Sequence, residues 1–165
     1  MKQTVLSLLV ENTSGVLSRV AGLFSRRGYN IDSLTVGVTK DPNFSRMTVA
    51  VTGDDQIIEQ IKKQLNRMVE VIKVIDFTNC SVCMKELLYV KVKKCTRHDK
   101  EELFQIAETF QARIVDYGKD SLLLEFVHSA GKNDAIIKLM KEEFQSIEVV
   151  RGGSVGIEAI NMTQR

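Results

Sequence analysis

The chain has 165 residues, enough for one large domain or for two of about 80 residues each. Its hydrophobic fraction of 44% and charged fraction of 27% are those of an ordinary globular protein and argue against disorder. The 23 basic and 21 acidic residues are well mixed and leave a net charge of +2, which provides no large basic field for nucleic acid.

No apolar stretch approaches the ~18 residues that a transmembrane helix needs, so no membrane partner is expected. The N-terminal segment MKQTVLSLLVEN has a short apolar run without a small-residue cleavage site, and it is interpreted as a first strand rather than a signal peptide. We also expect no transit peptide. Three cysteines, an odd number, suit a reducing compartment. A cytoplasmic location is therefore predicted, with a processed organellar protein as the alternative.

The first half of the chain alternates between the periods of strands and helices. QTVLSLLV is β-rich and apolar, as a central strand would be, and the pattern then changes to a helical stripe that Gly28 ends. Asp54 is expected to cap a second helix. The predicted elements are strand 3–10, helix 14–27, strand 29–39, strand 45–53, helix 54–68 and strand 69–77.

The second half repeats this order. It is predicted to contain strand 85–92, a helix with a capping box of Asp99 and Glu102, strands 113–118 and 121–127, a helix opening at 131–134, and strand 147–153. The glycine-rich segment 152–156 indicates a turn or tail, because no helix follows it to complete a phosphate cradle. The predicted fold is α+β, with two ferredoxin-like βαββαβ domains in tandem, residues 1–79 and 80–165.

One face of the first predicted sheet lacks a cover within its own half. We expect Thr4, Leu6 and Thr48 on this face, opposite the face that the two helices cover. A domain of this size buries too little surface alone. The second half of the chain or another copy must therefore cover the face, and dimerisation is a structural expectation.

The turn after the first strand carries the small residues Asn12, Thr13, Ser14 and Gly15. A helix N-terminus exposes up to four unpaired N–H groups and the positive end of the helix dipole, so a carboxylate or phosphate can bind there. Gly15 lets a ligand approach the backbone closely. If Thr13 or Ser14 caps the helix, the Asn12 amide is free. The alternative is an ordinary helix cap, since such residues are common there.

Other residues could complete a site for an α-amino acid. The amide oxygen of Asn30 could accept a hydrogen bond from an ammonium group, and Val16, Leu17 and Ile31 offer an apolar wall. Carboxylate donors, an ammonium acceptor and a small apolar pocket together predict a preference for an aliphatic amino acid.

Metal and catalytic motifs are weak. Cys80, Cys83, Cys95 and His98 match a zinc ligand pattern. The strand-like KELLYVKVKK between the two pairs rises ~3.3 Å per residue and would separate them by roughly 25 Å, whereas zinc–sulfur bonds are ~2.3 Å long. No phosphate-binding loop, nucleophile elbow or dinucleotide fingerprint is present in the sequence. We therefore predict neither metal ligands nor catalytic residues.

The run ENTSGVLSRVAGLFSRRGYNIDSLTV (residues 11–36), followed by DPNFSRMTV (41–49), resembles the N-terminal ACT domain of the acetolactate synthase small subunit. In that family ACT domains pair and valine binds between two of them. The positions that match the family's site are Asn12, Gly15, Val16, Leu17, Asn30 and Ile31.

The resemblance implies a non-catalytic regulatory subunit that forms a homodimer through its ACT domain and binds valine or a related branched-chain amino acid. It also implies a catalytic large subunit, with thiamine diphosphate, Mg and FAD, whose activity the chain raises and subjects to feedback inhibition in valine and isoleucine biosynthesis. The residues themselves imply only the amino acid site. The alternatives are a free-standing amino acid sensor with another partner and a small enzyme on the same scaffold.

Overall fold

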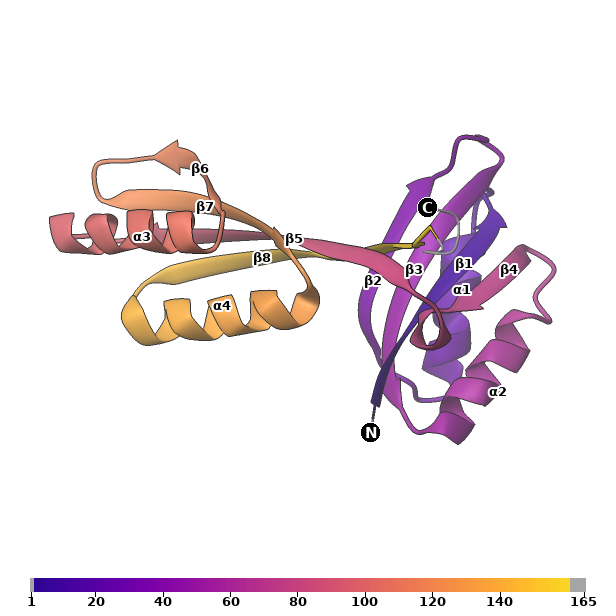
Figure 1. Ribbon diagram of the computed structural model, residues 1–165. Helices are drawn as coiled ribbons and strands as arrows, with labels where there is room; N and C mark the ends of the chain where they lie inside the picture. Colours follow the sequence, from indigo (N-terminus) through magenta and orange to yellow (C-terminus); the bar gives the residue numbers. More distant parts are fainter. Residues whose placement is uncertain (1, 161–165) are drawn as a thin grey trace. The chain divides into compact units, whose positions relative to one another are not determined.

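The computed structural model describes residues 2–160, which form two compact units (Figure 1). Unit 1 contains residues 2–84 together with 154–160, and unit 2 is Lys85–Gly153. The units differ from the ranges 1–79 and 80–165, whose residues 1 and 161–165 lie outside the described part. Residues 80–84 and 154–160 pack with the first sheet, because two long strands run from one unit into the other.

Unit 1 has the predicted βαββαβ order. Its sheet is antiparallel with strand order β2-β3-β1-β4, and α1 and α2 cover one face (Figure 1). The elements are β1 (Lys2–Glu11), α1 (Val16–Arg26), β2 (Ile31–Val38), β3 (Phe44–Gly53), α2 (Asp55–Leu65), β4 (Val71–Asp76) and a short 3-10 helix, η1 (Phe77–Asn79).

The core of unit 1 lies between the sheet and its two helices. Leu6, Leu8 and Val10 alternate along β1 toward the helices and are fully buried. The expectation that Leu6 lies on the uncovered face is therefore wrong. The period of a strand is two residues, so Thr4 shares the face of Leu6, and it is buried as well. Thr48 does lie on the other face, opposite Ser7 in the register.

The helix ends of unit 1 follow from local chemistry. The Asp54 side chain accepts a hydrogen bond from the N–H of Ile57 over 2.8 Å, which confirms the predicted cap of α2. Gly28 has φ +70°, a left-handed conformation that glycine adopts without strain. It ends α1 in a Schellman motif, in which Tyr29 N donates to Phe24 O over 3.0 Å.

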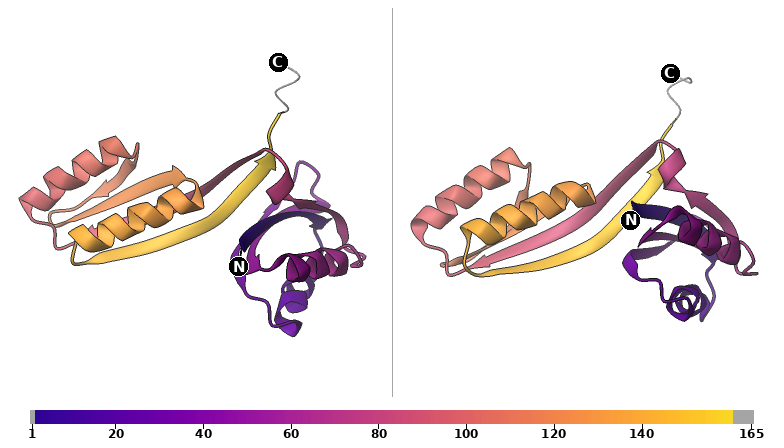
Figure 2. Two further views of the ribbon diagram at one scale, coloured as in Figure 1. Left: turned by 60° about the horizontal axis from the view of Figure 1, so that its bottom comes forward. Right: turned by 90° about the horizontal axis from the view of Figure 1, so that it is seen from below.

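Unit 2 repeats the topology with strand order β6-β7-β5-β8, and α3 and α4 lie on one side of its sheet (Figure 2). The N-cap of α3 is Thr96, which forms a capping box with Asp99 rather than the expected Asp99–Glu102 pair. Ser129 caps α4. The elements are β5 (Val82–Lys93), α3 (Arg97–Thr109), β6 (Arg113–Tyr117), β7 (Ser121–His128), α4 (Ala130–Glu143) and β8 (Ile147–Glu158).

The glycine-rich segment near the end of the chain is part of β8, not the expected turn or tail. Gly153 has φ +82°, a left-handed conformation that glycine adopts without strain. A Cβ atom at Gly156 would lie 2.7 Å from Cε2 of the Phe77 ring, so this glycine is needed for close packing in unit 1.

The face of the first sheet away from the helices is partly covered by the end of β8. Thr35 Oγ1 donates to Ser154 O over 2.9 Å, and Ser154 N donates to Ser33 Oγ over 3.3 Å. Ser7 and Thr48 on this face are buried. Part of the missing cover therefore comes from the second half of the sequence, one of the two sources expected.

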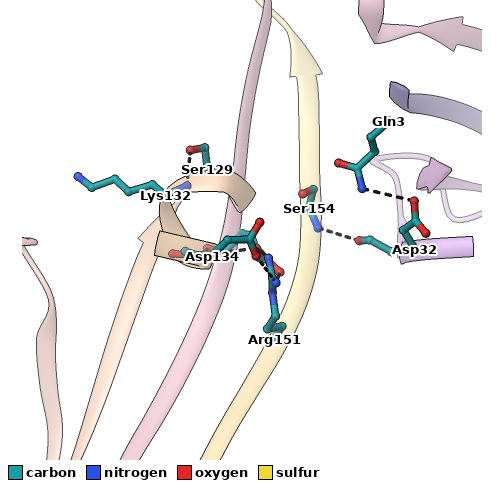
Figure 3. A network of polar contacts seen from close by, with 10 residues as sticks. Gln3, Asp32, Ser129, Lys132, Asp134, Arg151 and Ser154 are labelled. Atoms are coloured by element: carbon teal, nitrogen blue, oxygen red, sulfur yellow. Dashed lines mark hydrogen bonds and ion pairs between the residues drawn. The ribbon is translucent and has the colours of Figure 1, made fainter. Parts of the chain in front are cut away.

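A buried carboxylate anchors unit 2 near the start of β5. Glu86 is 4% exposed, and both its oxygens accept hydrogen bonds from Arg151, at 2.8 and 2.7 Å (the Arg151 region is shown in Figure 3). Arg151 also pairs with Asp134, and the Asn133 amide donates to Glu86. The hydrogen bonds from Arg151 are the main cause of a lowered pKa for Glu86, which outweighs the effect of burial.

Glu86→Gln is expected to destabilise the chain by about 1–3 kcal/mol at pH 7, because an amide replaces a charged acceptor in a buried network. Since folding lowers the pKa of Glu86, its contribution is fully present above the ordinary value of 4.5 and is lost as pH falls through the folded-state pKa. Urea unfolding of both proteins between pH 7 and pH 3 measures this. The difference should shrink below that ordinary value, and a constant difference would contradict the assignment.

Candidate effector site

The N-terminus of α1 is formed by a glycine. Gly15 is the N-cap residue with φ +86°, and no side chain caps the helix. The expected cap by Thr13 or Ser14 is therefore wrong. The turn is closed by the backbone instead, through the carbonyl of Thr13, which accepts from Val16 N over 3.4 Å.

Backbone donors at this helix end remain available. Among the described residues, neither Leu17 N–H nor Ser18 N–H has a hydrogen-bond acceptor, and the first turn contains no acidic side chain. The guanidinium of Arg19 lies beside Gly15, with Nη1 3.0 Å from where a Cβ would stand, and its Nε contacts Glu70 at 2.6 Å. The helix dipole and this cation together favour an anion.

The Asn12 side chain is held at the same end of the sheet. Its Nδ2 donates to Pro42 O over 2.9 Å, and its backbone N–H donates to Asn43 O over 2.7 Å. One N–H of the amide is thus used by the β2–β3 turn, and the second N–H and the oxygen remain for a ligand.

The apolar wall differs in part from the expected one. Val16 is 2% exposed and belongs to the core, so only its backbone faces the turn. Leu17 is 45% exposed beside the free donors. Val36 and Val38 follow Leu34 at every second position of β2 and share its face, on the helix side of the sheet. Both valines are exposed. Sequence reasoning missed these two valines, although the alternation of VGV in an edge strand was the available signal.

Asn30 and Ile31 lie at the opposite end of the same sheet. Val38 pairs with Ser45, which pairs with Val10 next to the α1 turn, whereas Ile31 aligns through β3 with Thr4. The stretch of β1 from residue 4 to residue 10 spans about 20 Å. The ammonium and carboxylate groups of a free amino acid are attached to the same carbon atom, so one ligand cannot span this distance. A single chain therefore does not bring the two groups of predicted residues together.

Asn30 has an acidic neighbour that sequence reasoning missed. Its Nδ2 donates to Asp32 Oδ1 over 3.2 Å, which leaves the amide oxygen free. The hydrogen bond from Thr52 to Asp32, at 2.7 Å, is the largest cause of a lowered pKa for Asp32, and Gln3 makes a further contact (Figure 3). Asp32 is thus ionised at neutral pH, and the pair offers acceptors for an ammonium group.

The cysteines lie apart from this site. Cys83 is exposed, Cys80 and Cys95 are half-buried, and burial is the main cause of a raised pKa for Cys95. Within residues 2–160, no three or more His, Cys, Asp or Glu side chains are grouped to hold a metal ion. In the same part of the chain, no helix combines the length and apolar character required to cross a membrane.

Fold and site together define a protein of two ferredoxin-like units, the first of which has the fold of an ACT domain. Two family models match: "AHAS small subunit-like ACT domain" over residues 6–73 and "Small subunit of acetolactate synthase" over residues 85–160. The chain belongs to the acetolactate synthase small-subunit family. It is accordingly a regulatory subunit and not a catalyst by itself.

Relatives match over nearly their whole length. A probable acetolactate synthase small subunit from Archaeoglobus fulgidus is 45% identical, covering 95% of this chain and 96% of the relative. The acetolactate synthase isozyme 3 small subunit of Escherichia coli is 39% identical, covering 93% of each. The crystal structure of the acetolactate synthase small subunit from Thermotoga maritima superposes with a TM-score of 0.86 at 36% identity, covering 98% of this chain and all of that one.

Proposed function

We propose that the first units of two copies bind valine, or a related branched-chain amino acid, across their interface and thereby regulate a catalytic subunit. The observation that carries this proposal is the separation of the predicted residues into two groups at opposite ends of one sheet. Each group supplies half of an amino acid site, so a complete site needs two chains.

Edge strand β2 provides a way to join the halves. It is one of the two edge strands of its sheet, and exposed Val36 and Val38 lie along it. Two copies that pair antiparallel through β2 form one continuous sheet with all helices on one face. In that arrangement the start of β2 in one copy lies beside the end of β2 in the other. Asn30 of the second copy then approaches Gly15 of the first.

The chemistry of such a site matches an α-amino acid. The ligand carboxylate accepts hydrogen bonds from Leu17 N–H and Ser18 N–H near Arg19. The ammonium group is held by the amide oxygen of Asn30 of the second copy. Small aliphatic side chains pack against Leu17, Val36 and Val38, which favours a branched-chain amino acid over a polar one.

Regulation requires that the ligand distinguish two arrangements of the dimer. Valine acts only if it binds one arrangement more tightly than the other, and coupling of ~1–3 kcal/mol is typical. The partner is the catalytic large subunit of acetolactate synthase, on which thiamine diphosphate, Mg and FAD reside, while this chain supplies no cofactor. We propose that it activates that subunit, confers feedback inhibition on branched-chain amino acid synthesis and works in the cytoplasm. Matches of 39% or more to whole small subunits favour this partner over a free-standing sensor.

The test is calorimetry of the purified chain with valine, leucine and isoleucine, combined with sedimentation to establish its mass. We expect a dimer with two valine sites, and tighter binding of valine than of glutamate. A monomer that binds valine, or a dimer that binds none of the three amino acids, would contradict the proposal.

Asn30→Ala is expected to weaken valine binding by ~1–3 kcal/mol, because it removes one hydrogen-bond partner of a buried ammonium group. Asn66→Ala is a matched control, since Asn66 is an exposed asparagine whose amide makes one local hydrogen bond, to Lys62 O. Calorimetric titration of both variants with valine provides the measurement. Equal affinities in the two variants would remove Asn30 from the site.

A further inference from the structure

Two hydroxyl side chains of β2 hold both backbone groups of one residue in β8. Thr35 Oγ1 donates to the carbonyl of Ser154 over 2.9 Å, and Ser33 Oγ accepts from its N–H over 3.3 Å. Ser154 is 6% exposed, so water competes little for these bonds. Ser33 and Thr35 are two residues apart and therefore point to the same side of the strand. We refer to these three residues as the β2–β8 clasp; all belong to unit 1.

The same strand is held within unit 2 three residues before the clasp. Arg151 donates to both carboxylate oxygens of Glu86, and the Asn133 amide donates to the same carboxylate. Gly153, between Arg151 and Ser154, has a left-handed φ of +82°. Strand β8 is thus held by side chains on both sides of Gly153. Figure 3 shows Ser154 together with the neighbouring residues Arg151 and Asp134.

We propose that Ser33 and Thr35 are positioning residues for regulation, which pass a valine-dependent shift of β2 to β8 and thus to the Glu86 anchor. The inference rests on the proposed function, because β2 is the strand on which the effector would act. Since the clasp fixes both the N–H and the carbonyl of Ser154, a shift of β2 must carry β8 with it or break both bonds. A merely structural clasp would affect stability but leave the response to valine unchanged.

The experiment compares Thr35→Val with wild type in the holoenzyme reconstituted with the catalytic subunit. Valine replaces threonine with a side chain of similar shape that cannot donate to Ser154 O. We expect activation without valine to persist and the valine concentration for half-inhibition to rise about tenfold, within the range of typical coupling factors. Calorimetry of the small subunit should give a valine Kd within about twofold of wild type.

Two further variants provide controls. Thr35→Ser keeps the hydroxyl and should restore inhibition to near the wild-type curve. Thr48→Val removes a hydroxyl from the register partner of Thr35 on β3, which is buried whereas Thr35 is half-buried, and which makes no hydrogen bond to Ser154 among the described residues. It should inhibit like wild type. Equal effects of Thr48→Val and Thr35→Val would overturn the proposal, as would an unchanged inhibition curve or a parallel loss of valine affinity in Thr35→Val.

A measurement without valine separates this inference from the proposed function. Exchange of the Ser154 amide hydrogen, followed by NMR in the free chain, should be at least about tenfold faster in Ser33→Ala than in wild type. Unchanged exchange would overturn the clasp even if valine binds. Failure of wild type to bind valine in calorimetry would instead overturn the proposed function, and with it the regulatory role of the clasp.

Discussion

Gly15→Asp is expected to weaken valine binding by at least ~2 kcal/mol, about 30-fold, while the chain stays folded and dimeric. The new carboxylate would stand at the N-terminus of α1, where the carboxylate of the ligand should bind, and it would compete for the free N–H groups and for Arg19. Its Cβ would meet only the end of a flexible arginine side chain, at 3.0 Å. Aspartate tolerates a left-handed backbone better than most residues, so the φ of +86° is compatible with folding.

Gly15→Asn separates charge from shape in this experiment. Asparagine has nearly the same size and the same tolerance of positive φ, but it carries no charge. We expect its loss of valine affinity in calorimetry to be clearly smaller than that of aspartate. Similar losses would attribute the effect to steric exclusion alone, and full affinity in Gly15→Asp would show that the carboxylate does not bind at this helix end. Thermal melting of both variants checks the fold.

The fold followed from hydrophobic periodicity and from local end signals. The alternation of β1 and the stripe of α1 predicted the βαββαβ order of unit 1, and Asp54 predicted the start of α2. The errors arose where two local signals compete. Thr13-Ser14-Gly15 offers both a hydroxyl cap and a glycine, and the left-handed Gly15 prevails. At α3, Thr96 lies outside the expected helix, so its pairing with Asp99 was missed.

Tertiary constraints explain the remaining differences. The strand β8 continues through Gly152, Gly153 and Gly156, and the Phe77 ring occupies the space that a side chain at position 156 would need. Sequence alone cannot show this, since glycine is more often found in turns. The exposed valines of β2 and the carboxylate of Asp32 were missed for a similar reason. The role proposed for them depends on a second copy, whose contacts a one-dimensional pattern does not show.

The separation of the candidate site was also beyond sequence reasoning. Asn12 and Asn30 are both near the ends of α1 in sequence, and a helix of eleven residues places its two ends ~16 Å apart. Family resemblance identified both residues but not their distance. The register of β1, β2 and β3 shows that they lie at opposite ends of the sheet, as the two-chain site implied by the resemblance requires.

Mixed dimers of Gly15→Asp and Asn30→Ala chains should recover one valine site with wild-type affinity, although neither variant alone has one. If each site combines α1 of one copy with Asn30 of the other, the mixed dimer contains one site with both substitutions and one with neither. Two different affinity tags and tandem purification isolate this species, and calorimetry then measures the stoichiometry and affinity of its tightest site.

The alternative gives a different titration curve. If each site were built within one chain, every site in the mixed dimer would carry one substitution, and the tightest would bind valine only as well as Asn30→Ala does, ~1–3 kcal/mol more weakly than wild type. A dimer of one Asn30→Ala chain and one wild-type chain controls for tags and purification, because it keeps one intact site under either arrangement. The affinity of the tightest site in the mixed dimer therefore decides whether two copies share the effector.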